Sequence, residues 1–434
     1  MAGEWKCIRV DEIAQRTATG PFGSAISSKY FCDTGVPVIR GSNLSQDIGT
    51  RLVDEGLTFV SEEKAEEFAR SEARTGDLVF TCWGTIDQVG LIDHRARYKR
   101  YIVSNKQMLL TPDPSRADSL FLYYAFSSPE NRAAILNRGI GSSVPGFNLG
   151  QLRMFEIVLP PLAEQKAIAS VLGALDDKIE LNRRMNATLE AMARALFQSW
   201  FVDFDPVRAK LDGRKPEGLD KATAALFPGA FQDSILGPIP QGWMASRIPD
   251  AVEVNPRRTL KSGVVAPYLD MKNLPTQGHS ADEVVDREFT SGTKFQNGDT
   301  LLARITPCLE NGKTGFVDFL DEGQVGWGST EYIVLAPKPP LPSQFGYLLA
   351  RSDALRVHAI QNMTGTSGRQ RVPSECFNTF YLAVPPLEIA RRFDELTTPL
   401  MSKIKSNAQE SRTLATLRDT LLPKLLSGEL RVRN

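Results

Sequence analysis

The stretch that decides the fold is PPLAEQKAIASVLGALDDKIELNRRMNATLEAMARALFQSWFVDFDP, residues 160–206, because a related sequence recurs later in the chain. Its leading motif, Leu159–Leu162 (LPPL), returns as Val384–Leu387 (VPPL). The same offset relates a gap-free series of identical residues downstream: Leu175, Lys178, Ile179, Asn182, Thr188, Leu189 and Leu196 recur as Leu400, Lys403, Ile404, Asn407, Thr413, Leu414 and Leu421. Such a series indicates an internal duplication.

Upstream of each copy the match is looser. Gly76–Leu78 corresponds to Gly298–Thr300, and Gly141–Ser143 corresponds to Gly365–Ser367. Slightly different offsets indicate small loop insertions. The chain is therefore predicted to be a variable unit, a helix, a second variable unit and a second helix.

Both repeated stretches have the heptad pattern of a coiled coil. In the first, predicted a positions are Ile168, Leu175, Asn182, Leu189 and Leu196, with Val171, Met185 and Met192 at d. In the second, they are Phe393, Leu400, Asn407, Leu414 and Leu421, with Leu396 and Leu417 at d. A polar Asn at the same a position of both copies favours a register-setting contact over the alternative, two ordinary amphipathic bundle helices. Pro399 should kink the second helix, but the apolar pattern continues past it.

The connections of the two helices predict that they pair antiparallel. A whole globular unit separates them, so a parallel pair would need a long return connection. At about 1.5 Å per residue, helices of this length would form a spacer of roughly 50 Å.

Composition excludes several classes of protein. The 434 residues include 51 Lys and Arg and 51 Asp and Glu, so the net charge does not indicate a nucleic acid or a membrane as a binding partner. Five scattered cysteines without a Cys-x-x-Cys pair argue against a zinc site or a disulfide scaffold and fit a reducing cytoplasm. The N-terminal sequence does not resemble a secretory signal, and no apolar run is long enough to span a membrane.

Each globular unit is expected to mix helices and strands. Short apolar runs bounded by turn residues predict strands at Val36–Ile39, Leu78–Thr81, Gln107–Leu110, Phe155–Leu159, Thr300–Ile305, Tyr332–Leu335 and Phe380–Val384. Helical patches lie at Ser61–Ser71, Ser119–Leu136 and Gln344–Gln361. The Pro- and Gly-rich segment Asp205–Gln241 is predicted to be an irregular linker rather than core.

A search for catalytic machinery finds little. His94, His279 and His358 lack metal-ligand spacing and are expected on the surface or in loops. Gly312–Thr314 ends like a phosphate-binding loop but has Pro307 where the motif needs Gly. Glu62–Lys64 contains the Glu-x-Lys of some nucleases, although a solvated charged helix is the better interpretation.

Loops rich in basic and amide residues are better candidates for contacts with DNA. Arg40–Asn43 and Met271–Asn273 follow a short strand early in each unit and carry side chains that can read guanine or adenine. Gly139–Asn148 and Thr364–Arg371 are Gly/Ser-rich loops whose backbone could approach phosphates. His94–Tyr101 holds four cations and two tyrosines and suits phosphate contact, with a solvated strand edge as an equal alternative.

These motifs resemble the specificity subunit of type I restriction–modification enzymes over essentially the whole chain. The most specific parts are residues 160–206, LFPGAFQDSILGPIPQGW in the linker, and LRDTLLPKLLSGELRV near the C-terminus. GDTLLARITPCLENGKTGFV and the GSS and GTS loops resemble that family's target recognition domains. Gly84–Gly90 in the first unit departs from the Arg304–Gly315 stretch of the second, so residue-level transfer between the units is weak.

The resemblance implies an α+β fold with an internal pseudo-two-fold repeat. Two mixed target recognition domains (residues 1–160 and, with the linker, 205–386) would be joined by spacer helices (161–204 and 387–434) in an antiparallel coiled coil. Each domain would read one half of a bipartite double-stranded DNA target. The helices would set the spacing and dock two modification (methyltransferase) subunits.

The resemblance further implies a non-catalytic subunit of a cytoplasmic, prokaryotic complex. No cofactor or metal is expected in this chain; S-adenosylmethionine, ATP and Mg²⁺ are expected on modification subunits and on restriction (translocase and endonuclease) subunits. Predicted DNA contacts are Arg40, Ser42, Asn43, Gln107, Ser142 and Ser143 in the first unit, and Lys272, Asn273, Arg304, Lys313, Thr366, Arg369 and Arg371 in the second. Asn182 and Asn407 are predicted to set the coiled-coil register.

Three alternatives stay open at this point. The chain could be the specificity subunit of a type II system that cuts near its site. It could be a protein-only coiled-coil adaptor, or a lone nuclease or methyltransferase, for which Asn255–Arg257 fails the Asn-Pro-Pro-Tyr motif.

Overall fold

The computed structural model describes residues 5–22, 25–141, 145–366 and 368–432. The chain forms two compact units: unit 1 is Met1–Leu181 with Ser411–Asn434, and unit 2 is Asn182–Glu410. Each unit contains one globular part and a length of both long helices, α6 (Leu162–Phe197) and α12 (Leu387–Leu426). The compact units therefore share the two helices, each of which crosses from one unit to the other.

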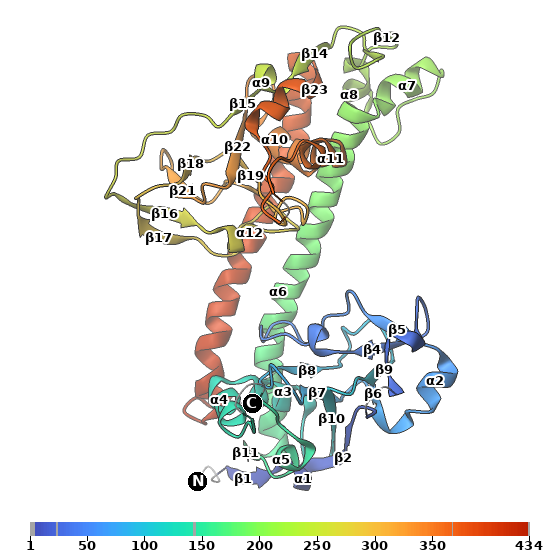
Figure 1. Cartoon of the computed structure of the whole chain (residues 1–434), viewed down its shortest axis with the longest axis vertical. Coiled ribbons are helices and arrows are strands. Elements are labelled where there is room, and N and C mark those ends of the chain that lie inside the picture. The colour runs from blue at the N-terminus through green and yellow to red at the C-terminus, as the bar shows by residue number, and fades with distance from the viewer. Residues whose placement is uncertain (1–4, 23–24, 142–144, 367, 433–434) are drawn as a thin grey trace. The chain divides into compact units, whose positions relative to one another are not determined.

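Unit 1 has three sheets (Figure 1). A two-stranded sheet pairs β1 (Lys6–Arg9) with β11 (Glu156–Leu159). A four-stranded antiparallel sheet has the order β2 (Ala14–Thr19), β10 (Gln107–Pro112), β7 (Leu78–Thr81) and β8 (Val89–Leu91). A five-stranded sheet has the order β3 (Phe31–Cys32), β5 (Thr58–Val60), β4 (Val36–Ile39), β9 (Arg100–Val103) and β6 (Glu72–Arg74).

Unit 2 repeats this plan, except that β3 of unit 1 has no counterpart among the strands described in unit 2. Its two-stranded sheet pairs β14 (Met244–Arg247) with β23 (Tyr381–Val384). Its two larger sheets have the orders β15 (Val252–Val254), β22 (Tyr332–Pro337), β19 (Thr300–Ala303), β20 (Thr314–Phe316), and β17 (Val285–Glu288), β16 (Val265–Leu269), β21 (Gly326–Gly328), β18 (Thr293–Phe295). Even the parallel pairing recurs, as β4 with β9 and β16 with β21. The predicted internal repeat is confirmed.

Each predicted helical patch in the globular parts is broken in two. Ser119–Leu136 becomes α3 (Ser119–Ser127) and α4 (Pro129–Asn137), and Gln344–Gln361 becomes α10 (Ser343–Arg351) and α11 (Asp353–Gln361). The break falls at Ser128 and Ser352, whose hydroxyls accept the backbone N–H of Asn131 and Leu355 as N-caps. The charged patch Ser61–Ser71 likewise divides into α2 (Glu62–Glu66) and the 3₁₀ turn η4 (Ala69–Ser71).

The prediction of an irregular linker is wrong. Residues 205–241 contain α7 (Asp205–Leu211), α8 (Lys221–Leu226) and the hairpin β12 (Phe231–Gln232) to β13 (Ile239–Pro240). Pro206 lies in the first turn of α7, where a missing N–H leaves no bond unmade. The aromatic residues among the prolines and glycines, Phe227 and the flanking Trp243, are buried in the core of unit 2.

Short elements complete the chain. They are α1 (Val10–Ile13), α5 (Leu149–Arg153), α9 (Ile248–Ala251), the π-turn η5 (Gln198–Val202) that extends α6, and the 3₁₀ turns η2 (Ser28–Tyr30), η3 (Gly41–Asn43), η6 (Met271–Asn273) and η7 (Ser374–Thr379).

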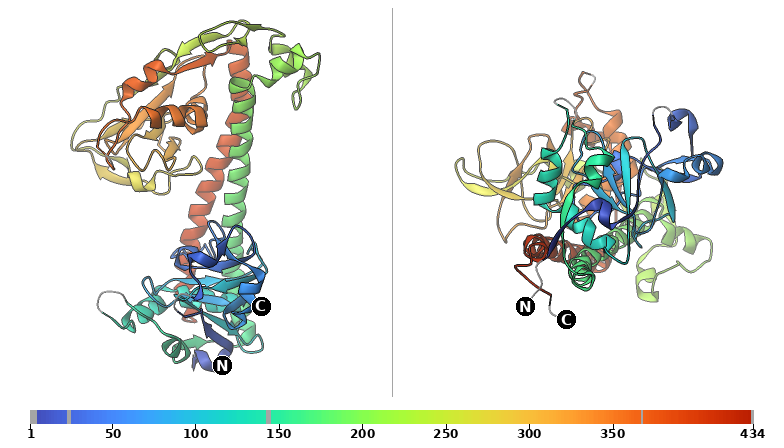
Figure 2. Two further views of the ribbon diagram at one scale, coloured as in Figure 1. Left: turned by 45° about the vertical axis from the view of Figure 1, so that its right-hand side comes forward. Right: turned by 90° about the horizontal axis from the view of Figure 1, so that it is seen from below.

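In both units α6 and α12 lie side by side and run in opposite directions (Figures 1 and 2). In unit 2 Asn182 contacts Glu410, whereas Asn186, one turn further along α6, contacts Ile404. In unit 1 the Asp176 carboxylate of α6 and the Arg418 guanidinium of α12 form a buried ion pair with an O–N distance of 2.7 Å. Pro399 does not end α12.

The predicted d positions are partly wrong. Met192 is 53% exposed and Leu417 is 45% exposed, so neither lies in the helix contact. Several positions four residues after an a position are buried instead: Leu172, Ala193, Ile404 and Leu425. The helices bury a face wider than a coiled-coil seam because each also packs against a globular part.

Candidate nucleic-acid interface

In unit 1 the first predicted contact loop lies directly after β4. Arg40 leaves the strand and Gly41–Asn43 turns as η3. The side chain of Asn43 is 1% exposed: its Oδ1 accepts the Arg40 N–H at 3.0 Å, and its Nδ2 donates to the Val53 carbonyl at 3.0 Å. Asn43 thus holds the loop in shape and offers DNA nothing in this structure, while Ser42 is exposed.

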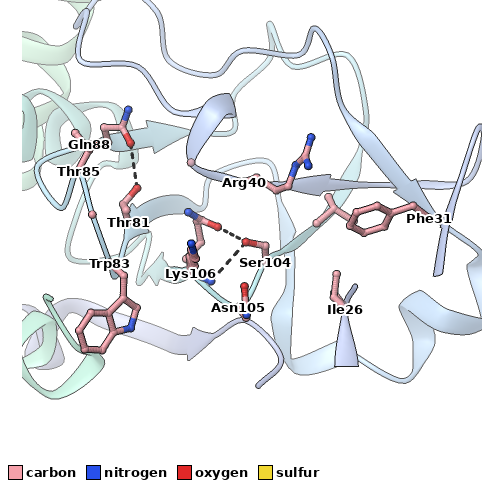
Figure 3. Close-up of a pocket in the computed structure, with 14 residues that line it drawn as sticks. Ile26, Phe31, Arg40, Thr81, Trp83, Thr85, Gln88, Ser104, Asn105 and Lys106 are labelled. Carbon is pink, nitrogen blue, oxygen red and sulfur yellow. Dashed lines mark hydrogen bonds between the residues drawn. The ribbon is translucent and has the colours of Figure 1, made fainter. Parts of the chain in front are cut away.

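Gln107 begins β10, directly opposite Thr81 at the end of β7. It is fully buried, and it lines a pocket of about 480 Å³ together with Arg40, Trp83, Ser104 and Lys106 (Figure 3). Two residues that are far apart in the sequence, Arg40 and Gln107, are therefore brought to one site. Sequence reasoning missed Trp83, Ser104 and Lys106.

The Gly/Ser-rich loop of unit 1 contains Ser142 and Ser143, which lie outside the described residues. Of its flanks, Ile140 and Gly146 bond each other, and Gly146 also forms a bridge with Trp83. A side chain at residue 146 would meet the Trp83 ring, since an added Cβ would lie 2.5 Å from it. Gly146 is therefore required by close packing of this loop against the residues that follow β7.

In unit 2 the equivalent loop after β16 is braced by Lys313. The Lys313 ammonium donates to the carbonyls of Met271, Lys272 and Leu274 at 2.7, 2.9 and 3.0 Å. Asn273 donates to Glu283. These two side chains are used by the fold, whereas the Lys272 side chain is exposed.

The other four predicted residues of unit 2 lie together. Arg304 and Arg371 lie on neighbouring segments, because Ile305 forms a bridge with Arg371. Arg371 forms a bidentate ion pair with Glu331, at 2.7 Å for the closest N–O contact, and this hydrogen bonding raises the pKa of the Arg371 guanidinium. Thr366 and Arg369 are exposed in the loop that closes through the bond between the Thr364 and Arg371 backbones. Of the set, Lys272, Thr366, Arg369 and Arg371 are exposed, and the first three lack the ion pair that Arg371 makes with Glu331.

Several side chains of the His94–Tyr101 run form ion pairs or hydrogen bonds within unit 1. Arg95 pairs with Asp93, Arg100 pairs with Glu62, and the Tyr101 hydroxyl donates to Asp54 at 2.8 Å. His94, Arg97 and Lys99 are exposed.

The two units differ most where the predicted contacts lie. Gln107 and Tyr332 occupy the same place, opposite the last residue of β7 and of β19 respectively. Arg40 and Asp270 both stand at the N-terminus of the following 3₁₀ turn. A shared scaffold thus carries different chemistry in its two copies, and aligning the repeats residue by residue would have shown this.

The histidines and the loop that resembles a phosphate loop lie elsewhere in the chain. Within the described residues, no group of three or more His, Cys, Asp or Glu could hold a metal ion, and no helix is long and apolar enough to cross a membrane. His279 is fully buried rather than on the surface, and its Nε2 lies 3.0 Å from an Asp318 carboxylate oxygen. Gly312–Thr314 resembles a phosphate loop in sequence, but in the structure the Lys313 ammonium donates to backbone carbonyls in and after η6.

Comparison with known proteins shows which family the chain resembles. Residues 3–191 match the family model described as the type I restriction modification DNA specificity domain. The resemblance predicted from the sequence is confirmed for this part of the chain.

Individual relatives agree. Over 378 residues the chain is 24% identical to the specificity subunit of the type I restriction enzyme HindI of Haemophilus influenzae, covering 76% of this chain and 81% of that protein. It is 26% identical over 327 residues to the MjaIX specificity subunit of Methanocaldococcus jannaschii, covering 72% and 69%. The crystal structure of a type I restriction–modification S subunit from M. genitalium shares the fold, with a TM-score of 0.55 at 15% identity over 97% of this chain and 96% of that one.

Proposed function

We propose that this chain is the DNA-specificity subunit of a type I restriction–modification enzyme. The observation that carries the proposal is the duplicated scaffold: two units with the same strand order, whose loops differ in chemistry at equivalent places. A protein that reads two unlike half-sites needs this combination. The match of residues 3–191 to the specificity-domain model supports it.

Each globular part reads one half of a bipartite duplex target through loops and pockets at the ends of β4, β7, β16 and β19. The accessible groups are Arg40, Ser42, Lys272, Thr366 and Arg369, with Gln107 reachable from the unit 1 pocket. Arg371 and Arg304 contribute near the Thr364–Arg371 loop. Asn43, Asn273 and Lys313 support the loops from within.

The helix pair sets the distance between half-sites and docks two modification subunits. This chain supplies recognition and no catalytic group. S-adenosylmethionine is bound by the modification subunits, and ATP and Mg²⁺ act with the restriction subunits.

The test is methylation mapping. The chain is co-expressed with the modification subunit encoded beside it in a methylation-free host, and modified bases are read across the genome. We expect one split motif, two short half-sites with a fixed gap. A stable complex that modifies no defined sequence would contradict the proposal and favour a protein-only adaptor; methylation coupled to cleavage at a fixed short distance would indicate a type II system.

A further inference from the structure

The pocket beside Gln107 in unit 1, which we call the donor pocket, has an unusual hydrogen-bonding inventory. The Gln107 side-chain oxygen is occupied, because it accepts the Ser104 hydroxyl. The Gln107 Nε2 is buried and has no hydrogen-bond partner among the described residues. The buried amide therefore has an unused donor, whereas its oxygen already accepts one hydrogen bond.

The Arg40 guanidinium adds donors on the same side. Its Nε is also buried without a partner among the described residues, and the guanidinium lies 6.0 Å from the centre of the Phe31 ring. Figure 3 shows Arg40 beside Phe31 on one side of the Ser104–Lys106 turn and Trp83 on the other. Lys106 contributes a second cation, and none of the residues that line the pocket is acidic.

A buried N–H without a partner destabilises the fold, so such a group in a native structure calls for an explanation such as a bound ligand. A group that carries hydrogen-bond acceptors and enters the pocket would satisfy both donors. A group that presents an amino hydrogen to Gln107 Nε2 or Arg40 Nε would meet another donor there and would leave both N–H groups without a partner.

We propose that the donor pocket takes a paired hydrogen-bond acceptor of the DNA half-site read by unit 1. This inference rests on the proposed function. Two parts of a duplex carry such pairs: the O6 and N7 of guanine, and the oxygens of a backbone phosphate. Unit 2 has no equivalent, because Tyr332 stands where Gln107 does and Asp270 where Arg40 does.

Gly41 provides a way to block the pocket without removing its donor. An added Cβ at Gly41 would lie 3.7 Å from Gln107 Nε2, an ordinary contact, and would meet nothing else within 4 Å. Gly41→Ala should therefore fold normally while a methyl group covers the amide. Gly229→Ala, where an added Cβ meets nothing within 4 Å, is the matched control.

The experiment compares Gly41→Ala and Gln107→Leu with wild type and with Gly229→Ala. Each is assembled with its modification subunit. Methylation motifs are mapped, and affinities for the wild-type target and for its single-base substitutions are measured in gel-shift titrations. The half-site read by unit 2 serves as an internal control, and melting curves establish that each variant is folded.

We expect both pocket variants to weaken binding to the wild-type target about tenfold to a hundredfold, with Gly229→Ala unchanged. If the acceptor is guanine, discrimination at one guanine position of one half-site relaxes and the other half-site stays intact. If it is phosphate, affinity falls equally for all sequences and the motif is unchanged.

Wild-type affinity and motif in a folded Gly41→Ala variant would overturn the inference. It would leave the proposed function standing, because the wild-type motif would still be defined. If the wild-type complex itself showed no sequence preference, the proposed function would fail first.

Discussion

At the residue scale, one buried arginine in each unit holds the globular part together, Arg51 in unit 1 and Arg351 in unit 2. Sequence patterns do not reveal these contacts. Arg351, at the end of α10, donates to the carbonyls of Thr276, Gly312 and Thr314 and to the hydroxyl of Tyr347. Arg51 in unit 1 lies 3.4 Å from the Tyr124 hydroxyl and pairs with Asp93. Buried arginines of this kind carry several bonds at once, so single substitutions should have large effects.

Arg351→Met should destabilise unit 2 by on the order of 3 kcal/mol, because several carbonyls lose a charged donor while the core keeps its volume. Arg356→Met is the control: Arg356 is an exposed residue of α11 paired with Asp353, and its loss should change stability by less than ~0.5 kcal/mol. Denaturant unfolding followed by tryptophan fluorescence measures both. Equal effects would contradict the assigned role of Arg351.

The cysteines should differ sharply in reactivity. Burial raises the pKa of the Cys82 thiol to about 12 and that of Cys376 to about 11, whereas Cys7 and Cys32 are exposed. At pH 8 the buried thiols stay protonated, and the thiolate is the reactive form. Iodoacetamide labelling read by mass spectrometry should modify Cys7 and Cys32 first.

The same shifts predict a pH dependence of stability. The folded-state thiol pKa values lie above the unfolded value of about 8.5. Their stabilising contribution is therefore complete below that pH and is lost as the pH rises towards 11 to 12.

In the labelling experiment, modification of native Cys82 as fast as Cys7 would show that the strand end at Cys82 opens readily.

At the element scale, the two buried asparagines have the geometry of a register contact. Asn407 donates to the Asn186 side-chain oxygen at 2.9 Å, and Asn182 donates to the Glu410 carboxylate at 2.8 Å. Both residues are fully buried. Asn186 was not predicted, although its place one turn after Asn182 puts it on the same helix face.

Replacing both Asn182 and Asn407 by Leu should loosen register rather than abolish pairing, because Leu packs in a seam without demanding one alignment. We expect mixed oligomers in sedimentation velocity. Thr188→Leu, on the exposed side of α6, is the control. A single monodisperse species in the double variant would remove the register role.

Tyrosines attach each globular part to α6 in both units. The Tyr124 hydroxyl donates to Asp176 at 2.5 Å, and the Tyr347 hydroxyl donates to Glu190 at 2.7 Å. In the repeated helices α3 and α10, Tyr347 matches Tyr123, so Tyr124 lies one residue beyond the equivalent position. Desolvation raises the pKa of both hydroxyls, so they remain donors over the physiological pH range. Both units thus use a tyrosine–carboxylate contact with α6, made from non-equivalent positions of the repeat.

At the scale of the whole molecule, unit 2 is one continuous piece of chain and unit 1 is not. Residues 1–181 alone would leave Asp176 buried without Arg418 and would expose the core that Leu422 and Leu425 cover. We expect residues 182–410 to fold cooperatively by calorimetry and residues 1–181 to fold only when 411–434 is fused to them. A cooperative transition of the 1–181 fragment alone would show that α12 is not needed there.

Much of this protein was predicted from its sequence alone: the duplication, the two long helices, most strands and the resemblance to type I specificity subunits. These follow from periodicity and local motifs, which depend on neighbouring residues. The helix breaks at Ser128 and Ser352 were not predicted. The apolar pattern continues across both serines, so it does not show that their hydroxyls accept backbone N–H groups and start a new helix.

Only the tertiary structure decided which candidate residues face solvent. Asn43, Asn273 and Lys313 look like DNA contacts in a linear sequence, yet their donors are used by backbone carbonyls of their own unit. Met192 and Leu417 have heptad spacing, but the face that each helix buries depends on which globular part packs against it. The donor pocket forms where Arg40, Trp83 and Gln107 meet, and each of these residues lies at or near the end of a different strand. Packing between segments that are far apart in the sequence determines which of these side chains are buried and which hydrogen bonds they make.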